Sequence, residues 1–221
     1  MSATGPVVRV VADAGAPPAD WDVRAVAIPG GHVMQSATWG ELRAGQGWEP
    51  HYLTFDDDHV ALVLLRRSSG LPGAEAVVRR GPAHAGEAGV VAAARAAALS
   101  SWARQAGARS LFLDPEQPAD EAYAAAMANA GFEATEGLEP SIHVMRRAFE
   151  PDLDEEALLH SFSKSTRQRI RAAQGAGTIV SETTDSARME AFAGLLHERA
   201  DVVGMQLETG TGFVARWRRL I

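Results

Sequence analysis

The densest group of residues suited to chemistry is a basic segment at residues 158–177. Its four cationic side chains fall within eight positions: Lys164, Arg167, Arg169 and Arg171. On a helix Lys164, Arg167 and Arg171 would share one face, because residues three, four and seven apart are neighbours. Such a face is suited to binding phosphate. The alternative is a solvated helix whose arginine stems cover apolar surface.

The same segment has the sequence pattern of a helix. A mostly apolar stripe recurs at helical spacing: Leu158, Phe162, Thr166, Ile170 and Ala173. Ser161, Ser163 and Ser165 are each suited to cap its start. Gly175 and Gly177 suit a left-handed cap at its end. We therefore expect one helix to present the basic face.

Composition restricts the class of protein. The chain has 221 residues, of which 46% are hydrophobic and 22% charged, and its net charge is −7. These values are ordinary for a globular protein, and the acidic balance requires any polyanion contact to be local. Cysteine is absent from the sequence and the histidines lack metal-ligand spacing, so we expect no metal and no cofactor. The sequence has neither a signal-peptide pattern nor a run of about 18 apolar residues, so we expect a cytoplasmic protein.

The order of predicted elements indicates an α+β fold. Strands are predicted at 7–11, 50–55, 59–67, 75–80, 109–113, 132–135 and 141–147. Asp56-Asp57-Asp58 is the predicted turn of a hairpin between the strands at 50–55 and 59–67. Helices are predicted at 19–28, after Ser36 as N-cap, in the alanine-rich run 87–106 and at 120–129. Together they predict a first domain, 1–150, with helices flanking a mixed, largely antiparallel sheet. Residues 151–221 are predicted to begin a second, incomplete domain with a strand at 178–182, a helix to about Val203 and another helix from 213.

An ordered set of short motifs resembles the Fem-type peptidoglycan-bridge aminoacyltransferases. In the first half these are Met34-Gln35-Ser36, Trp39-Gly40-Glu41-Leu42, Gly47-Trp48, Arg80-Gly81-Pro82, Leu113-Asp114-Pro115 and Gly131-Phe132. The segment Phe162–Ala173, followed by Gly177, is similar to the inter-domain signature of the family, and Glu198-Arg199 with Gly204 is similar to a later motif. The resemblance implies two acetyltransferase-like (GNAT-like) domains. Family members are longer, so the second domain is expected to be truncated in this sequence.

The resemblance also implies an activity. Family members move an amino acid from aminoacyl-tRNA to the stem peptide of a lipid-linked or UDP-linked muropeptide. The expected partners are therefore aminoacyl-tRNA, the muropeptide and, peripherally, the inner face of the membrane. An amine with a pKa of about 10.4 must lose a proton to attack the ester. His160, one turn before Lys164, is the nearest histidine, but a lone histidine is more often a surface or packing residue, and the catalytic residue stays unknown.

Seven residues are the predicted substrate contacts: Gln35, Trp39, Arg43, Lys164, Arg167, Arg171 and Arg216. The resemblance places Arg43 where the family often carries a lysine that contacts the substrate diphosphate. The alternative for Arg43 is an arginine that complements the dipole at a helix end. Trp39 fits a core position as well as a stacking platform, and Gln35 either contacts substrate or caps a turn. Arg216 aligns loosely with an arginine of the second domain of the family.

Two other functions stay open at this point. An acyl-CoA-dependent GNAT N-acyltransferase would need a pyrophosphate loop that leads into a helix. Arg171–Gly177 (RAAQGAG) has its first glycine one residue late and ends a predicted helix. The other alternative is a non-catalytic module that binds an anionic cell-wall precursor or tRNA. The P-loop, the dinucleotide fingerprint and the serine nucleophile elbow are absent from the sequence.

Overall fold

The computed structural model describes residues 6–67, 70, 72–83, 87–116, 121–135 and 152–204. The chain divides into two compact units, with the division between residues 142 and 143. The predicted domain boundary at 150/151 lies outside the described residues and stays a prediction. The described part of the first unit carries a five-stranded sheet, whereas that of the second unit is helical.

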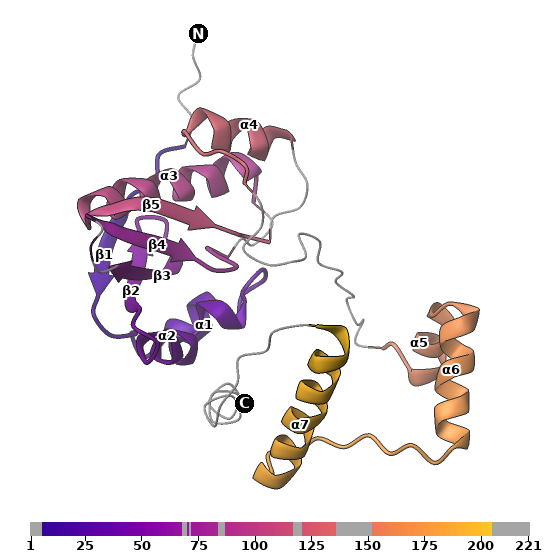
Figure 1. The fold of residues 1–221 in the computed structure, drawn as a ribbon. Coiled ribbons are helices and arrows are strands. Elements are labelled where there is room, and N and C mark those ends of the chain that lie inside the picture. Colours follow the sequence, from indigo (N-terminus) through magenta and orange to yellow (C-terminus); the bar gives the residue numbers. More distant parts are fainter. Residues whose placement is uncertain are drawn as a thin grey trace. The chain divides into compact units, whose positions relative to one another are not determined.

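The first unit confirms the predicted α+β fold with a largely antiparallel sheet (Figure 1). Its described elements are β1 (Val10–Ala14), α1 (Trp21–Ala25), a 3-10 turn η1 (Val33–Gln35), α2 (Ala37–Ala44), β2 (Glu49–Phe55), β3 (Val60–Arg67), β4 (Ala74–Val78), α3 (Gly89–Gln105), β5 (Ala108–Leu113) and α4 (Glu121–Asn129). The strands follow chain order across the sheet. The β1–β2, β2–β3 and β3–β4 pairs are antiparallel, and β4–β5 is parallel.

The sheet is buried on both faces because helices cover each side. Successive side chains of a strand point to opposite faces. In β3, Val63 and Leu65 join the core beneath α3, whereas Leu62 and Leu64 join the core with Trp21 of α1. Figure 1 shows α3 and α4 on one side of the sheet and α1 and α2 on the other. An uninterrupted apolar strand such as β3 is typical of a sheet covered on both faces.

The contact between α2 and β2 depends on a glycine. A Cβ atom added at Gly40 of α2 would lie 2.2 Å from the hydroxyl oxygen of Tyr52, and Tyr52 is only 2% exposed. We therefore expect Gly40→Ala to lower the free energy of unfolding by about 1–3 kcal/mol, because overpacking outweighs the better helix propensity of alanine. Urea unfolding would measure the change. Gly45→Ala is the control, since a Cβ there would meet its nearest atom at 3.5 Å; equal stability of Gly40→Ala and wild type would contradict this packing argument.

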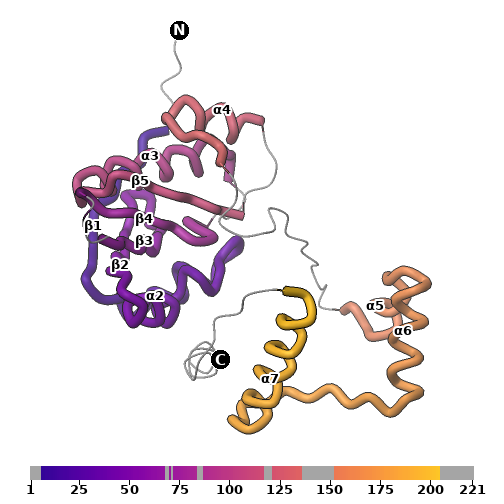
Figure 2. Tube along the Cα trace, viewed as in Figure 1, coloured from indigo at the N-terminus to yellow at the C-terminus, as the bar shows by residue number. Residues whose placement is uncertain are grey.

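In the second unit the four basic residues lie on one helix, as expected, but this helix begins at Lys164, so Leu158 of the predicted apolar stripe lies on the preceding helix. Its described elements are α5 (Glu155–Ser161), α6 (Lys164–Gly175) and α7 (Ser186–Val203), and Figure 2 shows the turn between α5 and α6. Phe162 and Ser163 separate them with extended backbone, at ψ 159° and 154°. The Ser163 hydroxyl accepts a hydrogen bond from the Thr166 backbone N–H at 3.2 Å. Of the three candidate serines, Ser163 is thus the cap, and an N-cap needs non-helical backbone. Gly177 follows the helix with φ 72°, which confirms the predicted left-handed position for this glycine, whereas Gly175 is the last residue of α6 and is not left-handed.

Two predicted strands are wrong. Residues 132–135 and 178–182 have no regular structure. Ile179 and Val180 are 88% and 93% exposed, although β-branched residues favour strands. A strand needs a neighbour to pair its backbone N–H and C=O groups, and the described part of the second unit holds no other strand. The predicted strand at 141–147 and helix from 213 lie outside the described residues.

Candidate functional site

Arg43 lies in the last turn of α2 and is held by two indole rings. The helix starts at Ser36, whose hydroxyl accepts a hydrogen bond from the Trp39 backbone N–H at 3.0 Å, which confirms the predicted cap. The Arg43 Cζ atom lies 5.8 Å from the ring centroid of Trp39 and 5.2 Å from that of Trp48. Its Nη1 donates to Oε1 of Gln46 at 2.6 Å. Arg43 is therefore a half-buried cation in a defined position.

A second arginine, which the sequence reasoning missed, contacts the same indole. The Arg66 Cζ atom of β3 lies 4.3 Å from the ring centroid of Trp48. The available signal was strand alternation: Arg66 follows Leu62 and Leu64 on the face that α2 covers. We call Trp39, Arg43, Trp48 and Arg66 the arginine–tryptophan cluster.

Gln35 is a structural residue in this arrangement. Its side chain is 1% exposed. The amide nitrogen donates to the carbonyl of Arg79 at 2.7 Å, and the amide oxygen accepts from the Leu62 backbone N–H at 2.9 Å. The amide therefore joins β3 to the loop after β4 through two backbone groups. This geometry argues against direct substrate contact by Gln35, because a ligand would have to displace both bonds in a buried position.

The carboxyl ends of the parallel strands β4 and β5 meet at one edge of the sheet. Arg79 and Arg80 follow β4, and Asp114 and Glu116 follow β5. The Arg80 backbone N–H donates to Oδ1 of Asp114 at 2.6 Å, and Nε of Arg79 lies 3.2 Å from its Oδ2. Nη1 of Arg80 lies 3.8 Å from Oε1 of Glu116. These contacts join the Arg-Gly-Pro motif after β4 to the Asp-Pro motif after β5, and they place a carboxylate beside each arginine. They also hold the backbone of Arg80 at the left-handed φ of 51°.

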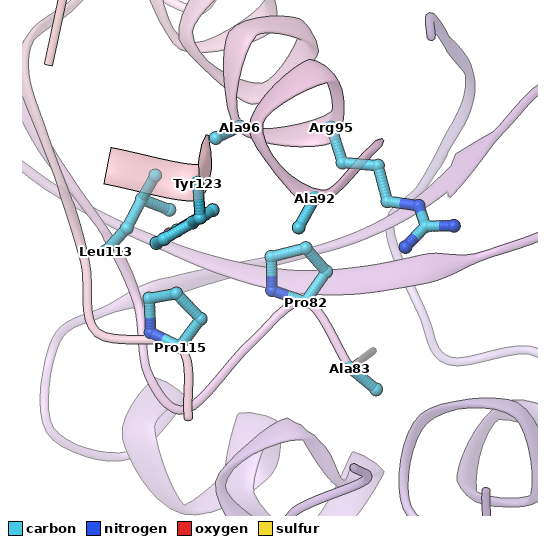
Figure 3. A pocket seen from close by; sticks show the side chains of 8 residues that line it. All are labelled: Pro82, Ala83, Ala92, Arg95, Ala96, Leu113, Pro115 and Tyr123. Carbon is cyan, nitrogen blue, oxygen red and sulfur yellow. The ribbon is translucent and has the colours of Figure 1, made fainter. Parts of the chain in front are cut away.

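A small pocket opens beside these loops (Figure 3). Its lining consists of Pro82, Ala83, Ala92, Arg95, Ala96, Leu113, Pro115 and Tyr123. Burial raises the pKa of the Tyr123 hydroxyl above its ordinary value, so this group is protonated at neutral pH. The Arg95 guanidinium points away from Tyr123 in Figure 3. Among the described lining residues there is no carboxylate and no imidazole, and most of these side chains are apolar.

Arg95 belongs to a buried polar cluster that closes one end of the first unit. Its side chain is 3% exposed, and its Nε donates to Oδ2 of Asp57 at 2.9 Å. It also pairs with Glu87, and its Nη2 lies 3.0 Å from Nδ1 of His59. Nδ1 of His59 also lies 3.3 Å from the Asp57 carbonyl oxygen, and Nε2 lies 3.4 Å from Oε1 of Glu87. The cluster joins the β2–β3 turn to the segment that leads into α3.

The three cationic side chains on the basic face of α6 differ in their exposure and contacts. Lys164 and Arg171 are exposed. Arg167 is half-buried, and its Nη1 donates to the carbonyl of His160 at 3.2 Å and to that of Phe162. Arg167 therefore stabilises the turn between α5 and α6. Phosphate binding by these three residues stays a prediction, with Lys164 and Arg171 as the side chains that extend into solvent.

Arg216 lies outside the described residues. The imidazole of His160 lies 3.8 Å from Glu156, one turn away on α5, and this exposed pair does not identify a base. Among the described residues no group of three or more His, Asp or Glu side chains could hold a metal ion. Within the described ranges, none of the helices combines the length and the apolar character needed to cross a membrane.

Comparisons with known proteins bear on the family and the fold of the chain. The model of the FemAB family matches residues 25–139, which is more than half of the chain and includes the whole arginine–tryptophan cluster. Among solved structures, the chain is similar to the crystal structure of FemX, with a TM-score of 0.70 and 20% sequence identity. That match covers 95% of this chain and 54% of FemX, so the chain spans about half the length of FemX. At this identity the likeness shows the fold alone, which is consistent with a GNAT-like fold. No curated protein matches the chain.

Proposed function

Since the chain belongs to the FemAB family, we propose that it is part of a transferase that forms peptidoglycan bridges. The proposed reaction moves an amino acid from aminoacyl-tRNA to the stem peptide of a lipid-linked or UDP-linked muropeptide. The family match over residues 25–139 is the observation that carries this proposal. The arginine–tryptophan cluster lies within the matched region and supplies positive charge in a unit that must bind an anionic substrate.

Both proposed substrates are polyanions, whereas the chain has a net charge of −7. Binding therefore depends on local cationic groups that outweigh the general repulsion. Arg43 is held in place by Trp39, Trp48 and Gln46. A cation fixed in this way loses little side-chain entropy when it binds a phosphate oxygen.

The proposed chemistry places modest demands on the protein. The amine nitrogen of the stem peptide attacks the ester carbonyl carbon, the amide bond forms, and the ester C–O bond to the tRNA ribose breaks. The amine proton passes to the released ribose hydroxyl. Because the ester is already activated, holding the two substrates in a reactive geometry supplies much of the rate enhancement. Two histidines of the first unit already contact charged side chains. Nδ1 of His59 lies 3.0 Å from Nη2 of Arg95, and Nδ1 of His51 lies 3.0 Å from Oδ2 of Asp13.

Mass spectrometry tests the proposal directly. The gene product that contains this chain is mixed with charged tRNAs and a UDP-linked muropeptide. We expect the muropeptide to gain the mass of one amino-acid residue, and to gain nothing when the tRNA is uncharged. A protein that binds the muropeptide but adds no mass with any charged tRNA would contradict the transferase proposal and favour a non-catalytic binding module.

Within the same assay, α6 gives a prediction about binding. We expect the double variant Lys164→Gln/Arg171→Gln to raise KM for the polyanionic substrate about tenfold, since charge-assisted hydrogen bonds contribute about 1.5–3 kcal/mol. The control is Arg169→Gln/Arg188→Gln, which removes the same charge from another face of α6 and from α7. Equal increases in both double variants would show that net charge alone is responsible and that α6 makes no specific contact.

The acyl-CoA-dependent alternative loses its only sequence motif. The RAAQGAG residues occupy the last turn of α6 and the residues after it, and the helix ends at Gly175. A pyrophosphate loop needs the backbone N–H groups of a helix N-terminus. The carbonyl end of α6 carries the opposite partial charge, so this segment is unsuited to pyrophosphate.

A further inference from the structure

We propose that Arg67, Arg104 and Arg109 form a docking surface for the phosphate backbone of an RNA, at the end of the first unit where β4 and β5 begin. The inference rests on the proposed function for the identity of that RNA, the tRNA that carries the amino acid. The ligand chemistry, an extended chain of phosphates, rests on the charge and packing of the first unit. The proposed role is docking, with no part in the transfer step.

Three elements bring these arginines to the turn between α3 and β5. Arg67 ends β3, Arg104 lies in the last turn of α3, and Arg109 is the second residue of β5. Ala74 of β4 pairs with Arg67 on one side and with Ala108 on the other, and Figure 1 shows β4 and β5 running in the same direction. The Cα atoms of Arg67 and Arg109 are therefore about 10 Å apart, which is two strand spacings.

Two glycines leave room for the arginine side chains at this turn. Gly107 has φ 80° and Gly73 has φ 79°, left-handed conformations that glycine adopts without a steric penalty. A Cβ atom added at Gly107 would lie 4.0 Å from Nη1 of Arg67. One added at Gly73 would lie 3.4 Å from Cβ of Arg109. The three arginines are exposed, so a ligand reaches their guanidinium groups directly from solvent.

The hydrogen-bond donors of these three guanidinium groups are available. Within the described residues, no carboxylate forms an ion pair with any of the three arginines. Two acids of the neighbouring strands, Glu49 and Glu75, contact other side chains instead. Oε2 of Glu75 accepts from Nη2 of Arg66 at 3.3 Å, and Oε1 of Glu49 lies 3.6 Å from Nε2 of His51. The three arginines therefore keep their full positive charge for a ligand.

Charge is distributed unevenly along the strands of the first unit. The opposite end of the sheet carries the Asp56-Asp57-Asp58 turn and, after β5, Asp114 and Glu116, and the arginines beside them pair with carboxylates. A polyanion is therefore attracted to one end of the sheet and repelled by the other, although the whole chain has a net charge of −7. Three guanidinium groups from three elements fit a chain of phosphates, because each can donate two parallel hydrogen bonds to a different phosphate.

RNA fits this surface better than a membrane does. Peripheral membrane binding combines basic residues with apolar side chains that enter the lipid. Among the described residues of the first unit, the exposed large hydrophobic side chains are Val7, Val11, Val23, Val33 and Val90. None of these valines lies in β3, in β5 or in the last turn of α3. The surface thus offers charge and hydrogen-bond donors without an apolar group to insert.

Fluorescence anisotropy of an uncharged tRNA, titrated with the chain at several salt concentrations, tests this surface. We expect Arg67→Gln/Arg109→Gln to weaken binding about tenfold and to lower the slope of log K against log salt concentration by about 1–2, because each lost phosphate contact releases fewer counterions. The matched control is Arg9→Gln/Arg199→Gln, which removes the same charge from exposed residues before β1 and in α7. We expect the control to stay within about twofold of wild type at each salt concentration.

The results separate the docking surface from the proposed function. Equal losses in the two double variants, an unchanged salt slope in Arg67→Gln/Arg109→Gln, or no tRNA binding by the wild-type chain at low salt would overturn the surface. None of these results touches the transfer assay, so the proposed function would stand. RNA binding that depends on the surface, in a gene product that transfers no amino acid, supports the surface and counts against the proposed function.

Two further measurements exclude other causes. Arg67→Lys/Arg109→Lys keeps the charge but loses the planar donors, so it should recover part of the affinity, and urea unfolding curves that match wild type exclude misfolding. Vesicles of phosphatidylglycerol and phosphatidylcholine test the membrane alternative. Vesicle binding that depends on the same two arginines, with RNA affinity unchanged, would assign the surface to a membrane and overturn the RNA proposal.

Discussion

Replacing Arg95 by methionine should lower the free energy of unfolding by about 3 kcal/mol. The Arg95 side chain is 3% exposed and pairs with Asp57 and Glu87. Removing it leaves two carboxylates close together without their cation, and breaking a buried ion pair costs about 3–5 kcal/mol. We expect the lower end of this range because Asp57 and Glu87 are 30% and 20% exposed and can recover some hydration.

Urea unfolding followed by tryptophan fluorescence would measure this loss, since Trp21 is buried in the core of the first unit. Arg104→Met is the control, because Arg104 is exposed in the last turn of the same helix. We expect it to cost no more than about 1 kcal/mol, mainly from the interaction with the helix dipole. Similar losses in the two variants would show that Arg95 contributes only as an ordinary helix residue.

Replacing Gln35 by methionine should lower the free energy of unfolding by about 2–4 kcal/mol. Methionine has a similar shape but no amide, so the Leu62 N–H loses the side-chain oxygen that it donates to, and the Arg79 carbonyl loses its donor. Each buried backbone group left without a partner costs about 1–3 kcal/mol. Gly81 packs directly on the amide, since a Cβ added there would lie 2.4–2.7 Å from its atoms, so the loop has little space in which to rearrange.

The same urea experiment tests Gln35, with Gln105→Met as the control because Gln105 is exposed at the end of α3. We expect the control to stay within about 0.5 kcal/mol of wild type. A Gln35→Met protein of wild-type stability whose KM for the muropeptide rises would reverse the assignment and make Gln35 a substrate contact, as the resemblance first indicated.

Local sequence patterns were sufficient to predict most helices and strands of the first unit. The alternating and apolar runs around the Asp56-Asp57-Asp58 turn predicted the hairpin of β2 and β3, and the alanine-rich run predicted α3. Ser36 caps α2, as expected from its hydroxyl group and its position directly before the helix. In the second unit, local patterns led to a wrong prediction. The β-branched residues at 178–182 form no strand, because a strand depends on pairing with a neighbouring strand that composition does not reveal.

For the candidate site as well, the sequence predicted some features and only the structure showed others. The sequence and its family resemblance placed Arg43 and Trp39 among the predicted substrate contacts, whereas the contact between these two side chains came only from the structure. The sequence also located a concentrated positive charge at Lys164 and Arg171. Whether that charge contacts phosphate is a prediction that the transfer assay tests.

By itself, the amino-acid sequence determined the first unit's hairpin, helices and helix caps, because these follow from interactions between residues a few positions apart. Only the tertiary structure decided that Gln35 is buried against the backbone of β3 and the loop after β4, and that Arg66 reaches the indole of Trp48 beside Arg43. Both contacts join residues distant in sequence. They depend on strand register and on helix packing, which arise from the summed burial of many side chains and not from any local motif.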